Sequence, residues 1–186
     1  LKDETDQIVA VAPIKLDDVL LISQNGYALR FNIEEVPVVG AKAAGVKAMN
    51  LKADDALQAA FICNTSSFYL LTQRGSLKRV SIEEIPATSR AKRGLQVLRE
   101  LKNKPHRVFL AGAVVEQGFI GDLFSTEVEE NDQTLLVQSN KGTIYESRLQ
   151  DLNLSERTSN GSFISDTISD EEVFDAYLKE IFKEDK

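Results

Sequence analysis

Three stretches of this chain carry the same pattern: LLISQNGYALRF at 20–31, YLLTQRGSLKRV at 69–80 and LLVQSNKGTIYES at 135–147. Each has an apolar run, a polar break that ends in glycine, and a second alternating run. Each glycine is followed 19 residues later by another, in the pairs Gly26 and Gly45, Gly75 and Gly94, and Gly142 and Gly161. A spacing that is kept three times indicates an internal repeat, and a repeat unit must stack on its neighbours to bury its apolar face.

Each copy is expected to form a β-hairpin. Asn25-Gly26 is the strongest turn signal, because a type I′ turn needs positive φ at both central residues. A strand-like run follows the second glycine, as at Val46 to Met49, and an apolar run such as Val108 to Ala111 closes the unit. This gives about four short strands per period of roughly 50 residues, which is typical of a blade in a propeller-like all-β fold. A β-sandwich with similar hairpins is the alternative.

The repeats define the expected boundaries along the chain. The chain starts partway through a unit and lacks an initiator methionine, so we expect it to be a piece of a longer polypeptide. The boundaries are 1–17 for the end of a preceding blade, 18–65 for a blade, 66–115 for a basic blade, 116–132 for an acidic inserted loop, 133–169 for a further blade and 170–186 for an acidic tail.

The residues offer little for catalysis. No Walker or Rossmann glycine-rich loop is present, and no His/Cys cluster has the spacing of a zinc site. The only histidine, His106, lies in a turn before a strand and is expected to be a surface residue. Cys63 is expected to be a small buried hydrophobe. We therefore expect no active site, no metal site and no cofactor in this chain.

Charge is distributed unevenly along the chain, whose formal net charge is −7. Residues 74–107 carry ten Lys/Arg and three Asp/Glu, a net charge of +7, whereas 1–73 carry −3 and 108–186 carry −11. A solvated surface is the ordinary explanation of such a run. Here, however, the basic residues gather around hairpin and second-glycine positions, which tend to share one rim of a blade. A basic rim predicts binding to the phosphates of duplex DNA without sequence readout.

The repeat, with its glutamate-rich connector before Pro37 and Pro86, resembles the C-terminal domain of the A subunits of bacterial type IIA topoisomerases, the family of DNA gyrase and topoisomerase IV. The resemblance covers the whole chain, most clearly 18–111. It implies a β-pinwheel of blades that binds and bends duplex DNA around a basic edge. The gyrase heptad Gln-Arg-Arg-Gly-Gly-Lys-Gly is absent from the corresponding loops, at 40–45 and 89–94, which favours topoisomerase IV.

The resemblance also implies partners and a location. Cleavage would belong to an upstream domain of the same chain, and ATP and Mg would be used by other domains or by the B subunit. The fragment itself would then not be an enzyme, although its parent would be an ATP-dependent isomerase, cytoplasmic and nucleoid-associated. The alternatives are the corresponding gyrase domain and a propeller-type protein-interaction scaffold.

The predicted DNA contacts are the basic residues of the second-glycine loops and hairpins. The loop contacts are Lys42, Lys47, Arg90, Lys92 and Arg93, and the secondary candidates are Arg74, Lys78, Arg79, Arg99, Lys102 and Lys104. Arg79 shares a repeat position with Arg30, where the third copy has Glu146, so we expect the third blade to contribute little to DNA binding.

The acidic end of the chain is expected to be helical. Residues 170–182, DEEVFDAYLKEIF, have apolar side chains at three- and four-residue spacing behind acidic residues that suit a helix start. Such a short amphipathic helix would dock on the last blade and seal its edge. Alternatively, the acidic segment would compete with DNA for the basic rim, in which case deletion from Asp170 onward should tighten DNA binding.

Overall fold

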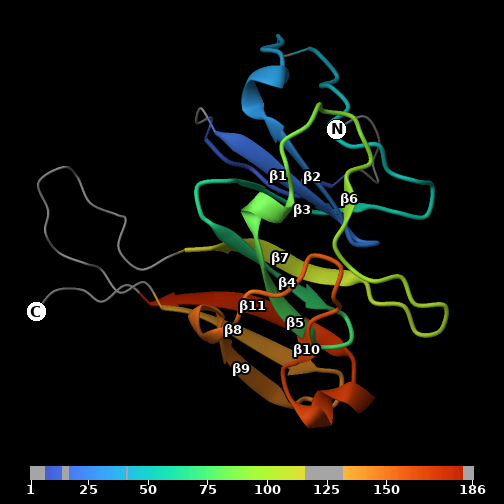
Figure 1. Cartoon of the computed structure of the whole chain (residues 1–186), viewed down its shortest axis with the longest axis vertical. Helices are drawn as coiled ribbons and strands as arrows, with labels where there is room; N and C mark the ends of the chain where they lie inside the picture. Colours follow the sequence, from blue (N-terminus) through green and yellow to red (C-terminus); the bar gives the residue numbers. More distant parts are fainter. Residues whose placement is uncertain (1–6, 14–16, 41, 116–131, 182–186) are drawn as a thin grey trace, which may run out of the picture.

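The structure is a computed structural model that describes residues 7–13, 17–40, 42–115 and 132–181 (Figure 1). Every regular element in these ranges is a β-strand or a short 3-10 turn, which confirms the all-β fold. The strands form three small antiparallel sheets that lie one after another along the molecule (Figure 1). We refer to them as blade 1, blade 2 and blade 3. The predicted acidic loop lies outside the described residues, apart from its last residue, Asp132.

The three blades share one order of strands across the sheet, with blade 2 described from the opposite edge. Blade 1 contains, from one edge to the other, β3 (Leu57–Ile62), β1 (Asp18–Ser23), β2 (Tyr27–Asn32) and β6 (Leu95–Gln96). Blade 2 contains β10 (Ser162–Phe163), β5 (Ser76–Ser81), β4 (Ser67–Thr72) and β7 (Val108–Val114). Blade 3 contains β11 (Val173–Ile181), β8 (Asp132–Ser139) and β9 (Ile144–Arg148). The 3-10 turns are η1 (Ile33–Glu35), η2 (Ile82–Glu84), η3 (Leu149–Asp151) and η4 (Asp166–Asp170).

Blades 1 and 2 are each completed by a strand from the following repeat. β6 follows Gly94 of the second repeat, yet it pairs with β2 of the first. In the same way β10 follows Gly161 of the third repeat and pairs with β5 of the second. The strand expected after the second glycine therefore forms, but in the neighbouring blade. The equivalent segment of the first repeat, at 46–49, forms no strand with the described residues.

The predicted hairpins are present, but their turn type differs from the prediction. Gly26 has φ of +80°, while Asn25 is not among the described residues with positive φ. The Gly26 amide donates to the Ser23 carbonyl at 3.0 Å. This is a type I turn followed by a left-handed glycine, which suits a three-residue loop. The side chain of Ser23 also accepts from the Tyr27 amide at 3.1 Å and so links the two ends of the loop.

The hydrophobic core lies between blades, as a stacked repeat requires. Along β4, Phe68 and Leu70 pack with residues of blade 1, whereas Tyr69 and Leu71 pack with residues of blade 3. All six residues of β4 are buried. The central strand is thus apolar on both faces, because a neighbouring blade covers each one.

The predicted tail helix is wrong, because these residues form η4 and strand β11. β11 pairs with β8 along its length. It takes the place that β3 and β7 have in the other blades, and all three pairings contain a bulge near the same point. The side chains beyond Val173 alternate between exposed and half-buried, as in a strand with one covered face. The acidic end is therefore part of the blade 3 sheet, and deletion from Asp170 would remove one of its three strands.

Candidate nucleic-acid interface

The second-glycine loop of the second repeat packs on blade 1 and brings two exposed lysines together. The Ala91 amide donates to the Ala48 carbonyl, and the Asn50 amide donates to the Lys92 carbonyl, both at 2.8 Å. Lys47 and Lys92 therefore lie on adjacent stretches of backbone. Each ammonium makes one short contact to a neutral side chain, Lys47 with Asn50 and Lys92 with Thr88, both at 2.7 Å. Both lysine side chains are exposed, so each can contact an anion in solution.

Arg90, in the same loop, joins the two repeats. Its backbone amide donates to Oε2 of Glu35 at 2.8 Å, and its guanidinium donates to the Lys47 carbonyl. The third repeat has the same arrangement one blade further on, where Arg157 donates to Glu84 and to the Gln96 carbonyl. The arrangement recurs in a blade that has no basic loop, so we infer that the first role of Arg90 is to hold neighbouring repeats together.

This inference gives a prediction for Arg90→Ala. Loss of the guanidinium leaves the Lys47 carbonyl without its donor, so we expect the free energy of unfolding to fall by about 1 kcal/mol. The salt dependence of DNA binding should hardly change. Urea denaturation would measure the free energy of unfolding, and a salt titration would measure the salt dependence of DNA binding. The exposed control Lys92→Ala should alter the salt dependence alone. An Arg90→Ala variant of unchanged stability and shallower salt dependence would contradict this assignment.

Beside the loop, the molecule has a cavity of about 100 Å³ with basic walls. Arg93 lines it and stacks on the Tyr27 ring, with its guanidinium carbon 3.8 Å from the ring centroid. The other cations in the walls are Lys52, Arg99 and Arg107, and the acids are Asp54 and Glu100. Tyr27, Lys52 and Arg107 are not among the contacts predicted from the sequence. A signal for Tyr27 was available, since it follows the hairpin glycine directly, where the other copies have Ser76 and Thr143.

A second basic cluster adjoins this cavity through His106. The Arg74 guanidinium lies 3.1 Å from both Nε2 of His106 and the Lys104 carbonyl, and 5.8 Å from the centre of the Phe163 ring. The prediction that His106 is a surface residue is wrong, since it is only 7% exposed. Burial, with a smaller contribution from the Arg74 charge, lowers the pKa of His106 below its usual 6.5. The imidazole thus acts as a neutral hydrogen-bonding link, with Nδ1 3.1 Å from Oγ1 of Thr72.

Two of the predicted DNA contacts, Lys78 and Arg79, form hydrogen bonds within the protein instead. Lys78 is 2% exposed and is not available to DNA. Its ammonium donates to the carbonyls of Val97, Arg157 and Ser159, at 2.5, 2.7 and 2.8 Å. Arg79 is half-buried, and its Nε donates to Oγ of Ser67 at 2.8 Å. Its repeat equivalent, Arg30, makes the corresponding contact to Asp18 at 2.7 Å, so this repeat position braces the two hairpin strands.

The remaining cations form a continuous series from blade 1 to blade 2, which we call the basic track. Lys47 and Lys92 lie on neighbouring stretches of backbone. Arg93, which follows Lys92 in the chain, lines the cavity. His106 also lines the cavity and contacts Arg74. Its members are Lys47, Lys52, Arg74, Lys92, Arg93, Arg99, Lys104 and Arg107. Lys42 and Lys102 are exposed, but no described contact joins them to it.

The third blade has a different charge pattern from the basic track. Arg148 lies 3.0 Å from Asp132 and 4.0 Å from Asp151, and Lys141 lies 3.6 Å from Glu171. Opposite charges thus face one another there. In the part of the chain that the structure describes, no group of three His, Cys, Asp or Glu residues is placed to hold a metal ion. The same part contains no helix with the length and hydropathy of a membrane span.

Comparison with known proteins identifies the family. The chain is 91% identical over 186 residues to the DNA topoisomerase 4 A protein of Streptococcus pneumoniae, and the match spans all of this chain but only 23% of that relative. A crystal structure of the C-terminal domain of DNA topoisomerase IV matches 88% of this chain and 46% of its own with a TM-score of 0.71 and 34% identity. The C-terminal domain of DNA gyrase A matches 89% of this chain and 52% of its own with a TM-score of 0.67; at 18% identity this shows the fold alone.

The family match falls on the two blades that carry the basic track. The model of the DNA gyrase C-terminal domain, a beta-propeller, matches residues 17–64 and 67–114. These two segments each contain one hairpin and its closing strand. The chain therefore belongs to the DNA gyrase C-terminal domain family of β-propeller modules.

Proposed function

We propose that this chain is the DNA-binding and DNA-bending module of a type IIA topoisomerase A protein, most similar to that of topoisomerase IV. The observation that carries this proposal is the basic track, a continuous series of cations on a chain whose net charge is −7. Duplex phosphates lie along its exposed lysines and Arg99 and its half-exposed arginines, and no base is read. Binding across two successive blades favours a curved path for the duplex.

The whole protein would have the wider activity. We propose that an upstream domain of the same polypeptide cleaves DNA and that the B subunit supplies ATP hydrolysis, with Mg used outside this fragment. Relaxation and decatenation of DNA in the bacterial cytoplasm, at the nucleoid, would follow. The support is the similarity to a topoisomerase 4 A protein, together with loops that lack the gyrase heptad.

A salt titration tests the DNA proposal. Binding to a short duplex should weaken linearly on a plot of log affinity against log salt, because released counterions drive it. The triple variant Lys92→Ala, Arg93→Ala, Arg99→Ala should make that slope shallower by about 0.9 for each phosphate contact removed. Fluorescence anisotropy at four salt concentrations would measure the slopes.

The matched control removes the same charge from blade 3, with Lys141→Ala, Arg148→Ala and Lys179→Ala. Its slope should stay close to that of the unaltered chain, since the basic track is intact. If the salt slope became equally shallow in both triple variants, DNA binding would depend on net charge alone. The absence of any salt-dependent binding would overturn the proposal in favour of a protein-interaction scaffold.

A further inference from the structure

The contact between successive repeats is built twice with the same hydrogen bonds. In blade 1, the Val97 amide donates to the carbonyl of Gly26 and the Thr88 amide donates to the carbonyl of Arg30. In blade 2, Ile164 and Ser155 donate to Gly75 and Arg79, which occupy the same repeat positions. The arginine pairings with Glu35 and Glu84 described above complete both sets. These two contacts show that the outer edge of a blade binds an extended segment of the next repeat.

Blade 3 has the same edge, on β9, but none of the described residues occupies it. A Cβ at Gly26 would lie 2.7 Å from Leu98, and one at Gly75 would lie 2.5 Å from Ile168, because the next repeat covers both glycines. Around a Cβ at Gly142, the described residues beyond its chain neighbours place no atom within 4 Å. Ile144 is 65% exposed, whereas its equivalents Ala28 and Leu77 are 0% and 3% exposed. The described part of the chain places no donor at the Gly142 and Glu146 carbonyls from outside the sheet.

Blade 3 keeps the hydrogen-bond acceptors that bind a segment of the next repeat in the other two blades. Asp151 has the repeat position of Glu35 and Glu84, so a carboxylate is available for a backbone amide. Its side chain is 67% exposed, and its ion-pair partner in the described residues is Arg148, at 4.0 Å. The Phe163 carbonyl has the position of the Lys47 and Gln96 carbonyls, which accept from the arginine of the next repeat. Both acceptors suit an arginine residue.

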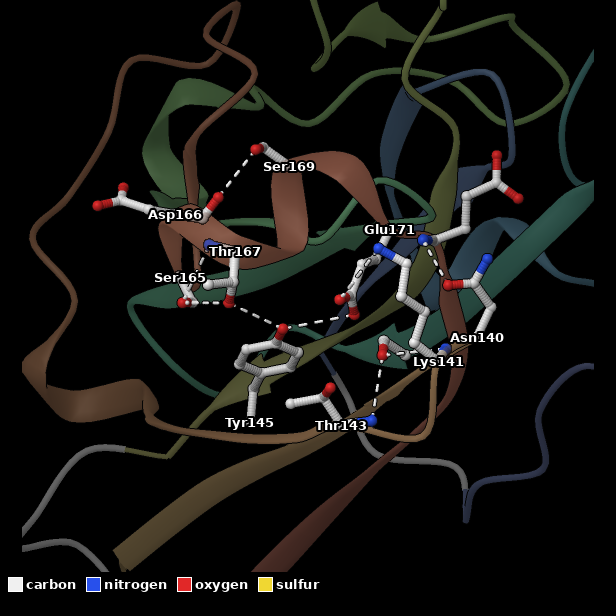
Figure 2. A network of polar contacts seen from close by, with 11 residues as sticks. Asn140, Lys141, Thr143, Tyr145, Ser165, Asp166, Thr167, Ser169 and Glu171 are labelled. Carbon is white, nitrogen blue, oxygen red and sulfur yellow. Dashed lines mark hydrogen bonds and ion pairs between the residues drawn. The ribbon is translucent and has the colours of Figure 1, made fainter.

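The hairpin that carries this edge is held in place from the other side. Figure 2 shows Tyr145 of β9 directed toward Thr167 and Glu171, with its hydroxyl oxygen 3.0 Å from Oγ1 of Thr167 and 3.4 Å from Oε2 of Glu171. Lys141 reaches the same carboxylate, and the Asn140 amide donates to the Glu172 carbonyl at 2.9 Å. The β9 edge is therefore ordered before anything binds to it, which lowers the entropy cost of binding.

We propose that the β9 edge is a docking site for an extended Arg-x-x-x-Gly segment of a partner polypeptide, which adds a fourth strand to blade 3. Both segments that occupy the equivalent edges have this spacing, Arg90 to Gly94 and Arg157 to Gly161. Main-chain hydrogen bonds provide the affinity in this mode, while the arginine and glycine provide the specificity. The corresponding segment of this chain's first repeat has Ala41 in place of the arginine, so a second copy is a poorer match.

Glycine is required because the incoming backbone approaches the edge closely. A Cβ at Gly161 would lie 2.5 Å from the Leu77 carbonyl oxygen, and one at Gly94 would overlap the Ala28 carbonyl. Both glycines also have positive φ, at +74° and +87°. A partner segment with any other residue at this position would clash with the carbonyl of Ile144, which has the place of Ala28 and Leu77.

The test uses a synthetic peptide with the sequence of residues 87–98, ATSRAKRGLQVL, added to the intact chain. Backbone amide NMR should show shifts at Thr143, Ile144 and Glu146. Ile144→Lys and Asp151→Ala in the chain, or alanine at the glycine of the peptide, should each weaken binding at least about tenfold. A scrambled peptide of the same composition controls for attraction to the acidic blade.

Three outcomes would count against the proposal. Binding that survives both Ile144→Lys and Asp151→Ala would mean that the peptide exchanges into blade 1 or blade 2. Equal binding of the scrambled peptide would mean charge attraction alone. A concentration-dependent dimer in sedimentation, lost in Ile144→Lys, would show that a second copy occupies the edge. Retained amide dispersion in Asp151→Ala would show that the variant is folded, so a lack of binding cannot be attributed to unfolding.

Discussion

Replacement of Lys78 by methionine should lower the free energy of unfolding by about 3 kcal/mol. Methionine has a similar volume but no donor, so the carbonyls of Val97, Arg157 and Ser159 would be buried without partners. These acceptors belong to the second repeat and to the loop of the third. The variant should therefore loosen the contact between those repeats, which urea denaturation and hydrogen exchange would detect.

The same lysine gives a pH dependence of stability. Burial lowers the pKa of Lys78 to about 7 from 10.5, with a smaller opposing effect of Glu84. Between these pH values the unfolded chain binds the proton more strongly than the folded chain, so stability from this group rises with pH. The difference in stability between the natural chain and Lys78→Met should thus be larger at pH 9.5 than at pH 7.

A surface lysine provides the control for both measurements. Lys102→Met changes an exposed residue, so stability should stay within about 0.5 kcal/mol and the pH dependence should persist. Equal effects of the two substitutions would show that the three carbonyl contacts of Lys78 do not stabilise the fold.

Gly94→Ala should be the most damaging small substitution in the chain, with a loss of more than about 3 kcal/mol. Its φ is +87°, and a Cβ there would overlap the carbonyl of Ala28 in β2. To relieve the overlap, β6 must move away from β2, which breaks the hydrogen bond from Val97 to Gly26. Denaturation, and exchange of the Val97 amide, would report the loss.

Gly45→Ala separates backbone strain from the clash. Gly45 has nearly the same φ, +78°, but no other described residue, apart from its chain neighbours, has an atom within 4 Å of the position of a Cβ. Only the cost of a left-handed alanine remains, about 1 kcal/mol. If both variants lost equal stability, the close approach of the Gly94 backbone to β2 would not be what requires glycine at this position.

The repeats, hairpins and stacking could be predicted from the sequence because they depend on local patterns. The last strand could not be recognised from spacing alone, since a dense apolar segment such as 173–182 fits both helical and strand periods. The repeats do indicate a strand here, because Val173-Phe174-x-Ala176 matches Val108-Phe109-x-Ala111 of β7. What decides the conformation is the open edge of β8, and that is a non-local feature.

The candidate interface was predicted less completely than the fold. Exposed lysines such as Lys92 could be identified from charge, but charge does not distinguish a solvated side chain from a buried one. Repeat position was more informative, because Lys78 aligns with Leu29, which is fully buried. Arg90 likewise aligns with Arg157 of the third blade, a match that indicates a structural contact.

The exchange of β6 and β10 between repeats also bears on how the chain emerges from the ribosome. Blade 1 cannot be completed until Gln96 has been synthesised, and blade 2 waits for Phe163. Each nascent sheet therefore keeps an unpaired edge while the next unit is being translated. Truncation after any repeat would leave the last complete hairpin in that same aggregation-prone condition.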